Sequence, residues 1–216
     1  MESDIEKYVH YVTVMTEGLY YCLVITAVSF VCSVLFGTLF AVLRHYGNRL
    51  SRLLIGGYVE VFRAMPPLTI FFILYFGLAH AGLHFSPLSA AITGLSMIGA
   101  AYCCEIIRSG LVALKKGDRE AALAAGLTPN QALRFIILPQ ALRTSLPSLG
   151  TYLIGLIKDT SIASAIAAPE ILFRARNLAS ESFETTAIYL VVALVYLVIT
   201  IPIAVGVGYL EKKAGR

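Results

Sequence analysis

The sequence predicts an all-α integral membrane protein whose helices cross the bilayer five times. Two features of its composition point to this class: 58% of the 216 residues are apolar and only 14% are charged, and the mean hydropathy is +0.79. A soluble domain is roughly one quarter charged, and a chain of this size leaves about a third of its surface exposed. The third feature is a set of long uncharged runs, which indicates that lipid covers the apolar surface.

Three runs without a charged residue are at least as long as the roughly 18 residues of a spanning helix. They extend over 18–43, 64–104 and 185–210. The middle run is too long for one helix, and turn-forming residues between Gly77 and Pro87 divide it in two. A further apolar stretch from Pro147 to Ala168 is interrupted only by Lys158 and Asp159. The predicted spans are 19–43, 58–79, 87–112, 147–168 and 186–210.

The basic residues gather in alternate connections. Segments 44–52, 105–145 and 211–216 carry a basic excess, whereas the residues before the first span and segment 170–184 carry an acidic excess. Because cytoplasmic loops collect Lys and Arg, we expect the amino terminus outside and the carboxyl terminus inside. The acidic start and the length of the first run predict a retained anchor rather than a signal peptide. We expect residues 1–216 to form a single transmembrane domain.

The sequence gives little support for a metal site, a disulfide or a nucleic-acid-binding surface. The four cysteines lie inside apolar runs without metal-ligand spacing. His80 and His84 fall in a turn without a third candidate ligand. A net charge of +4 is too sparse for a surface that tracks phosphates.

The connection over 115–145 is long for a loop without a function. Asp118 is placed to cap one short helix, and Gly126 to close it in a left-handed conformation. Thr128 and Gln131 have the spacing of a capping box that begins a second helix, which Pro139 is expected to end. Leu133, Ile136 and Ile137 would share one face of it. The segment therefore predicts a rigid two-helix elbow in the cytoplasm.

This elbow carries a recognisable motif. Glu120-Ala121-Ala122, followed by Gly126 and then by Ile136-Ile137-Leu138-Pro139, resembles the EAA loop of bacterial ABC importer permeases. Three other segments resemble the polar amino-acid branch, the histidine, glutamine and arginine type, and they occur in the same order and spacing. They are 58–63 (YVEVFR), 101–108 (AYCCEIIR) and 158–162 (KDTSI).

The resemblance implies the type I ABC importer permease fold, with the elbow as a coupling helix that seats on a separate ATP-binding subunit. The coupling residues that it implies are Arg119, Glu120, Ala121, Ala122, Ala125, Gly126, Leu127 and Thr128. The implied assembly has two copies of the ATPase, a second permease subunit (the same chain or a paralogue) and an external amino-acid-binding protein. It lies in the bacterial inner membrane.

The chain has no Gly-x-x-x-x-Gly-Lys-Ser/Thr run, the motif that cradles nucleotide phosphates. We therefore expect no catalytic residue and no cofactor here, with ATP and Mg²⁺ held by the partner ATPase. The elbow would convert movement of that partner into tilting of the adjacent spans. The simpler alternative is an amphipathic hairpin that lies on lipid headgroups.

Lys158 and Asp159 are the second candidate site. Asp159 lies about 18 Å along a helix from Pro147, near the bilayer midplane, where charged side chains are costly and usually functional. Adjacent residues diverge by about 100°, so the two charges need separate partners. We hypothesise that Asp159 binds the substrate ammonium group with the Thr160 and Ser161 hydroxyls nearby. Lys158 then pairs within the protein or holds the substrate carboxylate; the simpler alternative is an interhelical ion-pair network.

Tyr152 and Gly155 lie on the same helix face as Asp159, and neither is acidic. A path for a cationic side chain would be expected to offer a second carboxylate, so the sequence favours a polar uncharged or an acidic amino acid. Two further pairs are spaced three residues apart near the inner surface, and we interpret them as structural pairs or gate elements. These are Glu60 with Arg63, and Glu105 with Arg108.

Two other classes of membrane protein have sequence features that this chain lacks. An ion-coupled secondary amino-acid transporter predicts inverted repeats, and these five spans show none. An intramembrane enzyme needs a nucleophile and a base at matched depth, and the four histidines fall outside the spans or at their ends.

Overall fold

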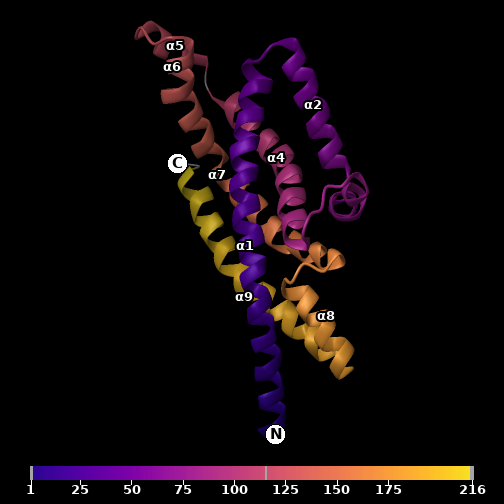
Figure 1. Ribbon diagram of the computed structural model, residues 1–216. Helices are drawn as coiled ribbons and strands as arrows, with labels where there is room; N and C mark the ends of the chain where they lie inside the picture. Colours follow the sequence, from indigo (N-terminus) through magenta and orange to yellow (C-terminus); the bar gives the residue numbers. More distant parts are fainter. Residues whose placement is uncertain (1, 115, 215–216) are drawn as a thin grey trace.

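The structure is a computed structural model that describes residues 2–114 and 116–214. Every regular element within these residues is a helix, which confirms the all-α class. The longest helices are α1 (Glu2–Tyr46), α4 (Pro87–Ala113), α7 (Leu138–Asp159) and α9 (Thr185–Ala214). Figure 1 shows that α1 runs almost the whole length of the molecule, while the others each cover part of it. α4 packs against both α1 and α7, and α9 packs against α7.

Helix α1 is longer than the predicted span 19–43, because it begins at Glu2 and ends at Tyr46. No proline interrupts it. Its first half is held by packing as well as by helix propensity: Tyr11 and Met15 are buried in a cluster with residues of α8 (Ile171–Ser182) and α9. Gly18 faces the backbone of Ile171, and a Cβ atom at Gly18 would lie 2.7 Å from the Ile171 Cα atom. The two backbone segments approach so closely there that only glycine fits.

The second predicted span, 58–79, is not one straight helix. Helix α2 (Arg49–Ala64) ends before an extended Met65, and α3 (Pro67–Phe72) starts in a direction bent by 103°. The cause is the Pro66-Pro67 pair, since the residue before a proline is driven out of the helical region. A π-helical turn, η1 (Ile73–Gly77), and a 3-10 turn, η2 (Leu78–Ala81), complete the segment. The predicted turn follows, with Gly82 at φ +82°.

Helix α4 matches the predicted span 87–112 closely. Ser86 caps its start by accepting a hydrogen bond from the Ser89 backbone N–H, and Pro87 stands at its first position, where no N–H donor is needed. Most of its inward residues are small, and Gly99 faces Ser33 of α1 so closely that a Cβ there would lie 1.9 Å from the Ser33 Oγ. α4 is therefore the buried centre of the bundle.

The loop 115–145 differs from the expected pair of separate helices. It contains α5 (Lys116–Ala124), α6 (Pro129–Ala132) and the π-helical turn η3 (Leu133–Ile137), which continues directly into α7. Pro139 does not end a helix, because it falls in the first turn of α7, after the π turn, where a missing N–H leaves no gap. Asp118 lies in the first turn of α5 rather than at its cap.

The predicted span 147–168 corresponds to α7, which begins earlier, at Leu138, and contains Pro147 in its interior. At Asp159 the chain tightens into the 3-10 helix η4 (Thr160–Ile166), and α8 (Ile171–Ser182) and α9 follow. Glu170 begins α8: its carboxylate accepts hydrogen bonds from the backbone N–H groups of Leu172 and Phe173, at 2.9 and 2.7 Å.

By length and apolar character, α1, α4 and α9 can each cross a membrane, and α2 with α3 forms a fourth segment if the bent pair counts as one. The protein is therefore an integral membrane protein by composition and by helix length. The count of five spans and the orientation of the chain remain predictions.

Candidate functional site

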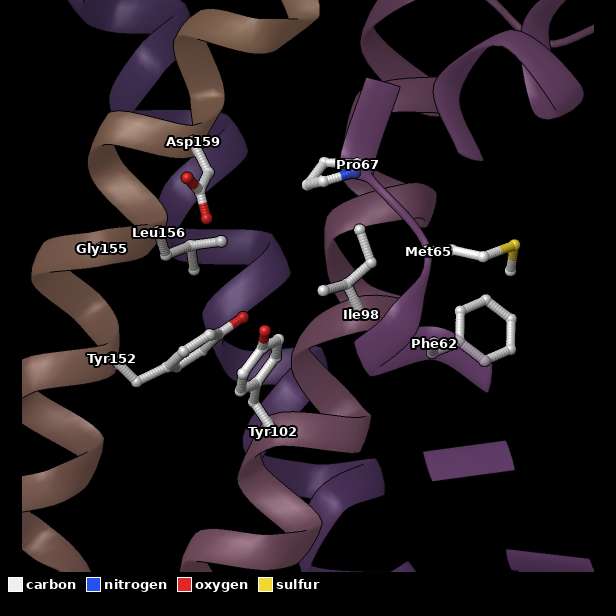
Figure 2. A pocket seen from close by; sticks show the side chains of 9 residues that line it. All are labelled: Phe62, Met65, Pro67, Ile98, Tyr102, Tyr152, Gly155, Leu156 and Asp159. Atoms are coloured by element: carbon white, nitrogen blue, oxygen red, sulfur yellow. The ribbon is translucent and has the colours of Figure 1, made fainter. Parts of the chain in front are cut away.

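Three predicted residues of α7 meet in one cavity. Tyr152, Gly155 and Asp159 are spaced by three and four residues, which places them on one face of the helix, and all three line a cavity of about 190 Å³. Figure 2 shows the carboxylate of Asp159 at one end of this space. The prediction that these residues share a face is confirmed.

The opposite wall comes from α2, α3 and α4. Because the chain bends sharply after Ala64, Met65 and Pro67 stand at a corner opposite Asp159 (Figure 2). The remaining lining residues were not predicted as site residues. These are Phe62, Ile98 and Tyr102 on this wall, and Leu156 on α7 beside Asp159.

Two tyrosines form the aromatic part of the cavity. The rings of Tyr102 and Tyr152 stack, with centroids 6.1 Å apart and planes at 19°, and their hydroxyl groups point into the same space as the Asp159 carboxylate (Figure 2). Phe30 of α1 also stacks on Tyr152, with ring centroids 6.3 Å apart. These two ring contacts restrict the orientation of the Tyr152 ring.

The cavity is suited to a cation. The carboxylate of Asp159 accepts no hydrogen bond from the residues that the structure describes, so its oxygens are open to a ligand. Asp159 is also the last residue of α7, where the helix dipole adds partial negative charge. Aromatic rings beside a carboxylate favour an ammonium group through cation–π attraction.

Thr160 and Ser161 are not in the cavity, contrary to our expectation. The Thr160 side chain is fully buried, where its hydroxyl donates to the Ile157 carbonyl at 2.7 Å and lies 3.2 Å from the Cys22 Sγ. The Ser161 hydroxyl donates to the Lys158 carbonyl at 2.6 Å. The change from α-helix to 3-10 helix at this point turns both hydroxyls back onto the backbone of α7.

Lys158 is exposed and does not line the cavity. Among the described side chains it has no ion-pair partner, so the expected pairing within the chain is not found. Arg63 is the cation placed beside the cavity, since its guanidinium carbon lies 5.4 Å from the centre of the Tyr102 ring. Glu60 and Arg63, although both described, form no ion pair with each other.

Glu105 and Arg108 do form the expected pair, with the Arg108 Nη2 atom 2.7 Å from the Glu105 Oε2 atom. Arg44 of α1 joins them from across the bundle by pairing with Glu105. Sequence spacing could not reveal this third member, because it belongs to another helix. The three residues tie α1 to α4 at the end of the bundle nearest the 115–145 loop.

The loop itself has an outer and an inner face. Five of the expected coupling residues have exposed side chains or an exposed backbone: Glu120, Ala121, Ala125, Gly126 and Thr128. Ala122 is only 3% exposed and packs inward with Ala132 and Ile137, and Leu127 packs on the same cluster. Ala122 and Leu127 therefore support the loop from its inner face. The Arg119 side chain lies outside the described residues.

The geometry of the loop is determined locally. Gly126 has φ +84°, a left-handed conformation that favours glycine. It allows the Leu127 N–H to reach the Ala122 carbonyl at 3.2 Å and so ends α5. The predicted capping box is confirmed: the Thr128 side chain accepts from the Gln131 backbone N–H, while the Gln131 side chain accepts from the Thr128 N–H at 2.9 Å.

The loop is anchored on two helices of the bundle. Ile137 and Ala141 are buried with Ile107 and Leu111 of α4. At Gly110 a Cβ atom would lie 2.7 Å from the Ala141 carbonyl oxygen, so α4 and α7 are in backbone contact just below the loop. A force on the loop must therefore pass into α4 and α7.

Comparison with known proteins gives consistent results. Residues 33–216 match the family described as "Binding-protein-dependent transport system inner membrane component". A probable glutamine ABC transporter permease protein of Bacillus subtilis (strain 168) is 36% identical over 91% of this chain and 91% of its own length. The glutamine transport system permease protein of Escherichia coli (strain K12) is 31% identical over 94% of this chain and 93% of its own length.

Among solved structures, the chain is similar to one described as an amino acid ABC transporter crystallised with histidines. The TM-score is 0.88 at 29% identity, and the match covers 96% of this chain and 97% of the other. The arrangement of helices described above is thus shared over almost the whole length of both chains.

Proposed function

Because this chain belongs to the family of binding-protein-dependent transport system inner membrane components, we propose that it is the permease subunit of an ABC importer for polar amino acids in the bacterial inner membrane. Relatives that match over nine tenths of both chains are named as amino-acid or glutamine permeases. Proteins of this family work with an ATPase subunit and a solute-binding protein. The chain therefore supplies a path across the membrane, and the partner ATPase binds ATP with Mg²⁺.

The observation that carries this proposal is the continuity of α7. One helix joins the π turn of the exposed loop to Asp159, a separation of roughly 30 Å at 1.5 Å per residue. A rigid helix transmits displacement along its length, so movement of an ATPase docked on the loop would move the wall of the Asp159 cavity. Because one wall of the cavity belongs to α7 and another to α4, movement of α7 relative to α4 would open and close the cavity.

The docking surface that we propose is the outer face of the loop. Small side chains at Ala121 and Ala125, with the exposed backbone of Gly126, permit close approach of a partner, and Glu120 offers a polar contact. Two ATPase copies and a second permease, identical or paralogous, would complete the assembly. An amphipathic hairpin lying on lipid would not need the capping box or the left-handed glycine.

For the substrate we propose that Asp159 binds the α-ammonium group in the cavity beside the two tyrosines. The carboxylate of the amino acid would be bound by a cation near the cavity, and two are available: Arg63 over Tyr102 and the exposed Lys158. Asp159 is the single acidic residue among the described residues that line the cavity. This favours a substrate with a polar uncharged or acidic side chain.

Asp159→Asn tests the role of the carboxylate. We expect ATP-dependent uptake of the best substrate into proteoliposomes to fall at least about tenfold, because an amide cannot replace a charge-assisted hydrogen bond. Glu181→Gln makes the same chemical change on an exposed residue of α8 and should leave uptake unchanged. Gly155→Leu is a second variant, since Gly155 faces open space where a side chain would fill the cavity. Full uptake by both cavity variants would contradict the proposal.

The energy source of uptake distinguishes an ABC importer from an ion-coupled carrier. Uptake should require the ATPase subunit with internal ATP and should persist when an uncoupler collapses the proton gradient. Accumulation by the chain alone, abolished by the uncoupler, would instead identify a secondary transporter.

We also propose the topology of a single five-span domain with the amino terminus outside. In a variant without native cysteines, His10→Cys should react with a membrane-impermeant maleimide added outside right-side-out vesicles. Asn130→Cys, on the loop, should react only after the vesicles are opened. The reverse pattern would overturn the orientation.

A further inference from the structure

A second cavity, of about 380 Å³, lies between α1, α2 and α4. The second cavity and the Asp159 cavity lie on opposite sides of α4. Ala100 lines the second cavity and Ile98 lines the Asp159 cavity. These two residues are two positions apart, which corresponds to about 200° of rotation around a helix. The second cavity therefore faces away from the proposed substrate path.

The walls of this groove are suited to a hydrocarbon chain. None of the described residues that line it is charged, and its surface is formed mainly by Cys32, Phe36 and Phe40 of α1 with Met97 and Ala100 of α4. Its polar groups are already partly engaged within the protein. The Tyr58 hydroxyl donates to the Met97 carbonyl at 2.7 Å, and the Ser96 hydroxyl donates to the Ile92 carbonyl at 2.6 Å.

One end of the groove approaches a cluster of arginines. Phe40 and Tyr58, whose ring centroids are 5.0 Å apart, line it toward the α1–α2 turn. Along the helix axis, Arg44 is one turn beyond Phe40, and Arg52 is about 9 Å beyond Tyr58. The end of the groove is thus within about 10 Å of the positively charged turn.

Positive charge at this turn is not balanced among the residues that the structure describes. Segment 44–52 has three arginines and no acid, and Arg44 alone of these has a described acidic partner, Glu105. Arg49 and Arg52 are exposed and without an acidic partner among the residues described. Arg52 uses its Nε atom to bind the Gly47 carbonyl at 3.2 Å, and its two terminal nitrogens remain for a phosphate.

We propose that the groove binds one acyl chain of an anionic glycerophospholipid, whose phosphate is held by Arg49 and Arg52. The apolar groove ends close to this unbalanced positive charge, so one lipid can place an acyl chain in the groove and its phosphate at the two arginines. Anionic headgroups are attracted to juxtamembrane basic residues. The site depends only on the location of the chain in a membrane and not on the proposed substrate.

The chain contains no tryptophan, so one introduced indole reports on a single position. Phe36→Trp places it at the groove, and Phe76→Trp places it at another exposed aromatic outside the groove. The full-length variants are placed in nanodiscs with phosphatidylglycerol or phosphatidylcholine brominated on the acyl chain. We expect brominated phosphatidylglycerol to quench the Phe36→Trp variant preferentially, and the two lipids to quench the Phe76→Trp variant equally.

The charge contribution is tested in the Phe36→Trp background. Arg52→Gln should lower the preference for phosphatidylglycerol about fivefold, the contribution expected of one surface basic residue. Lys212→Gln, which removes an exposed charge elsewhere, should not change it. Equal quenching by both lipids would overturn the anionic headgroup site. Protection of Phe36→Trp from both lipids would show that a protein surface fills the groove, which would also overturn the proposal.

Discussion

Glu170 illustrates how one side chain can couple stability to pH. It is fully buried, in the connection between the predicted spans 147–168 and 186–210. Burial raises the pKa of its carboxyl group to about 7, although the hydrogen bonds from Leu172, Phe173 and Tyr196 act in the opposite direction. In the unfolded chain the same group has its ordinary pKa, near 4.5. The native state therefore binds the proton more tightly than the unfolded state does.

The sign of the pH dependence follows from linkage. Between about pH 4.5 and 7 the folded protein holds more protons on Glu170, so stability falls as the pH rises through this window and is constant above it with respect to this group. We expect the thermal unfolding midpoint in detergent to be higher at pH 5 than at pH 8. In Glu170→Gln this difference should shrink, and an unchanged difference would assign the effect to other groups.

The substrate cavity shows which residues a sequence can reveal. Tyr152, Gly155 and Asp159 could be predicted together because they lie on one helix, where spacing alone determines the shared face. Tyr102 and Phe62 belong to other helices, and only tertiary packing brings them to Asp159. Thr160 and Ser161 were placed wrongly because the change of helix type after Asp159 has no distinct sequence signal.

At the scale of elements, the 115–145 loop depends on one backbone conformation. Gly126 has φ +84°, so Gly126→Ala introduces strain of about 1 kcal/mol and should weaken the ordered end of α5. We expect reduced stimulation of ATPase activity by the loaded binding protein, with little effect on assembly in the membrane.

Gly117→Ala is the matched control for this prediction. Gly117 lies within α5, without a positive φ and with open space around it, so alanine is expected to be neutral or slightly stabilising there. Equal stimulation of ATPase activity in the two variants would show that the left-handed conformation of Gly126 has no role in transmitting movement between the ATPase and the permease.

Helix boundaries were predictable where capping residues mark them, and less so at prolines. Thr128 with Gln131 begins a helix as expected. The predicted span 87–112 starts where Ser86 caps a helix and Pro87 opens it. The sequence predicts that a helix ends at Pro139, but the π turn before this residue lets the helix continue. The Pro66-Pro67 bend, in contrast, does interrupt the predicted span. A proline thus indicates a local break, and its surroundings decide whether the helix resumes.

At the scale of the whole molecule, close contacts between helices hold α1 to α8 and α9. Gly18 packs against the backbone of Ile171, and Glu184, just before α9, pairs with Lys7 and accepts a hydrogen bond from Tyr11 at 2.8 Å. These contacts join the first half of α1 to the last third of the chain. Hydropathy alone predicted the long helices but could not predict which of them touch.

Gly18→Ala tests this packing. A Cβ atom at 2.7 Å from the Ile171 Cα atom must displace the backbone, so we expect a destabilisation of about 1–3 kcal/mol from overpacking, measured as a lower unfolding midpoint. Gly57→Ala, in a helix with open space around the glycine, should be neutral or stabilising by up to about 1 kcal/mol. A similar midpoint for both variants would mean that α1 and α8 separate without loss of stability.

The length of α1 has a consequence for the shape of the protein. Its 45 residues extend roughly 65 Å, whereas the hydrocarbon layer is about 30 Å thick. Even at a tilt of about 40°, the upper end of the usual range, the helix would cover about 50 Å of depth. Some of it must therefore project as a stalk beyond the lipid. Its height would be visible as a protrusion above the disc in electron micrographs.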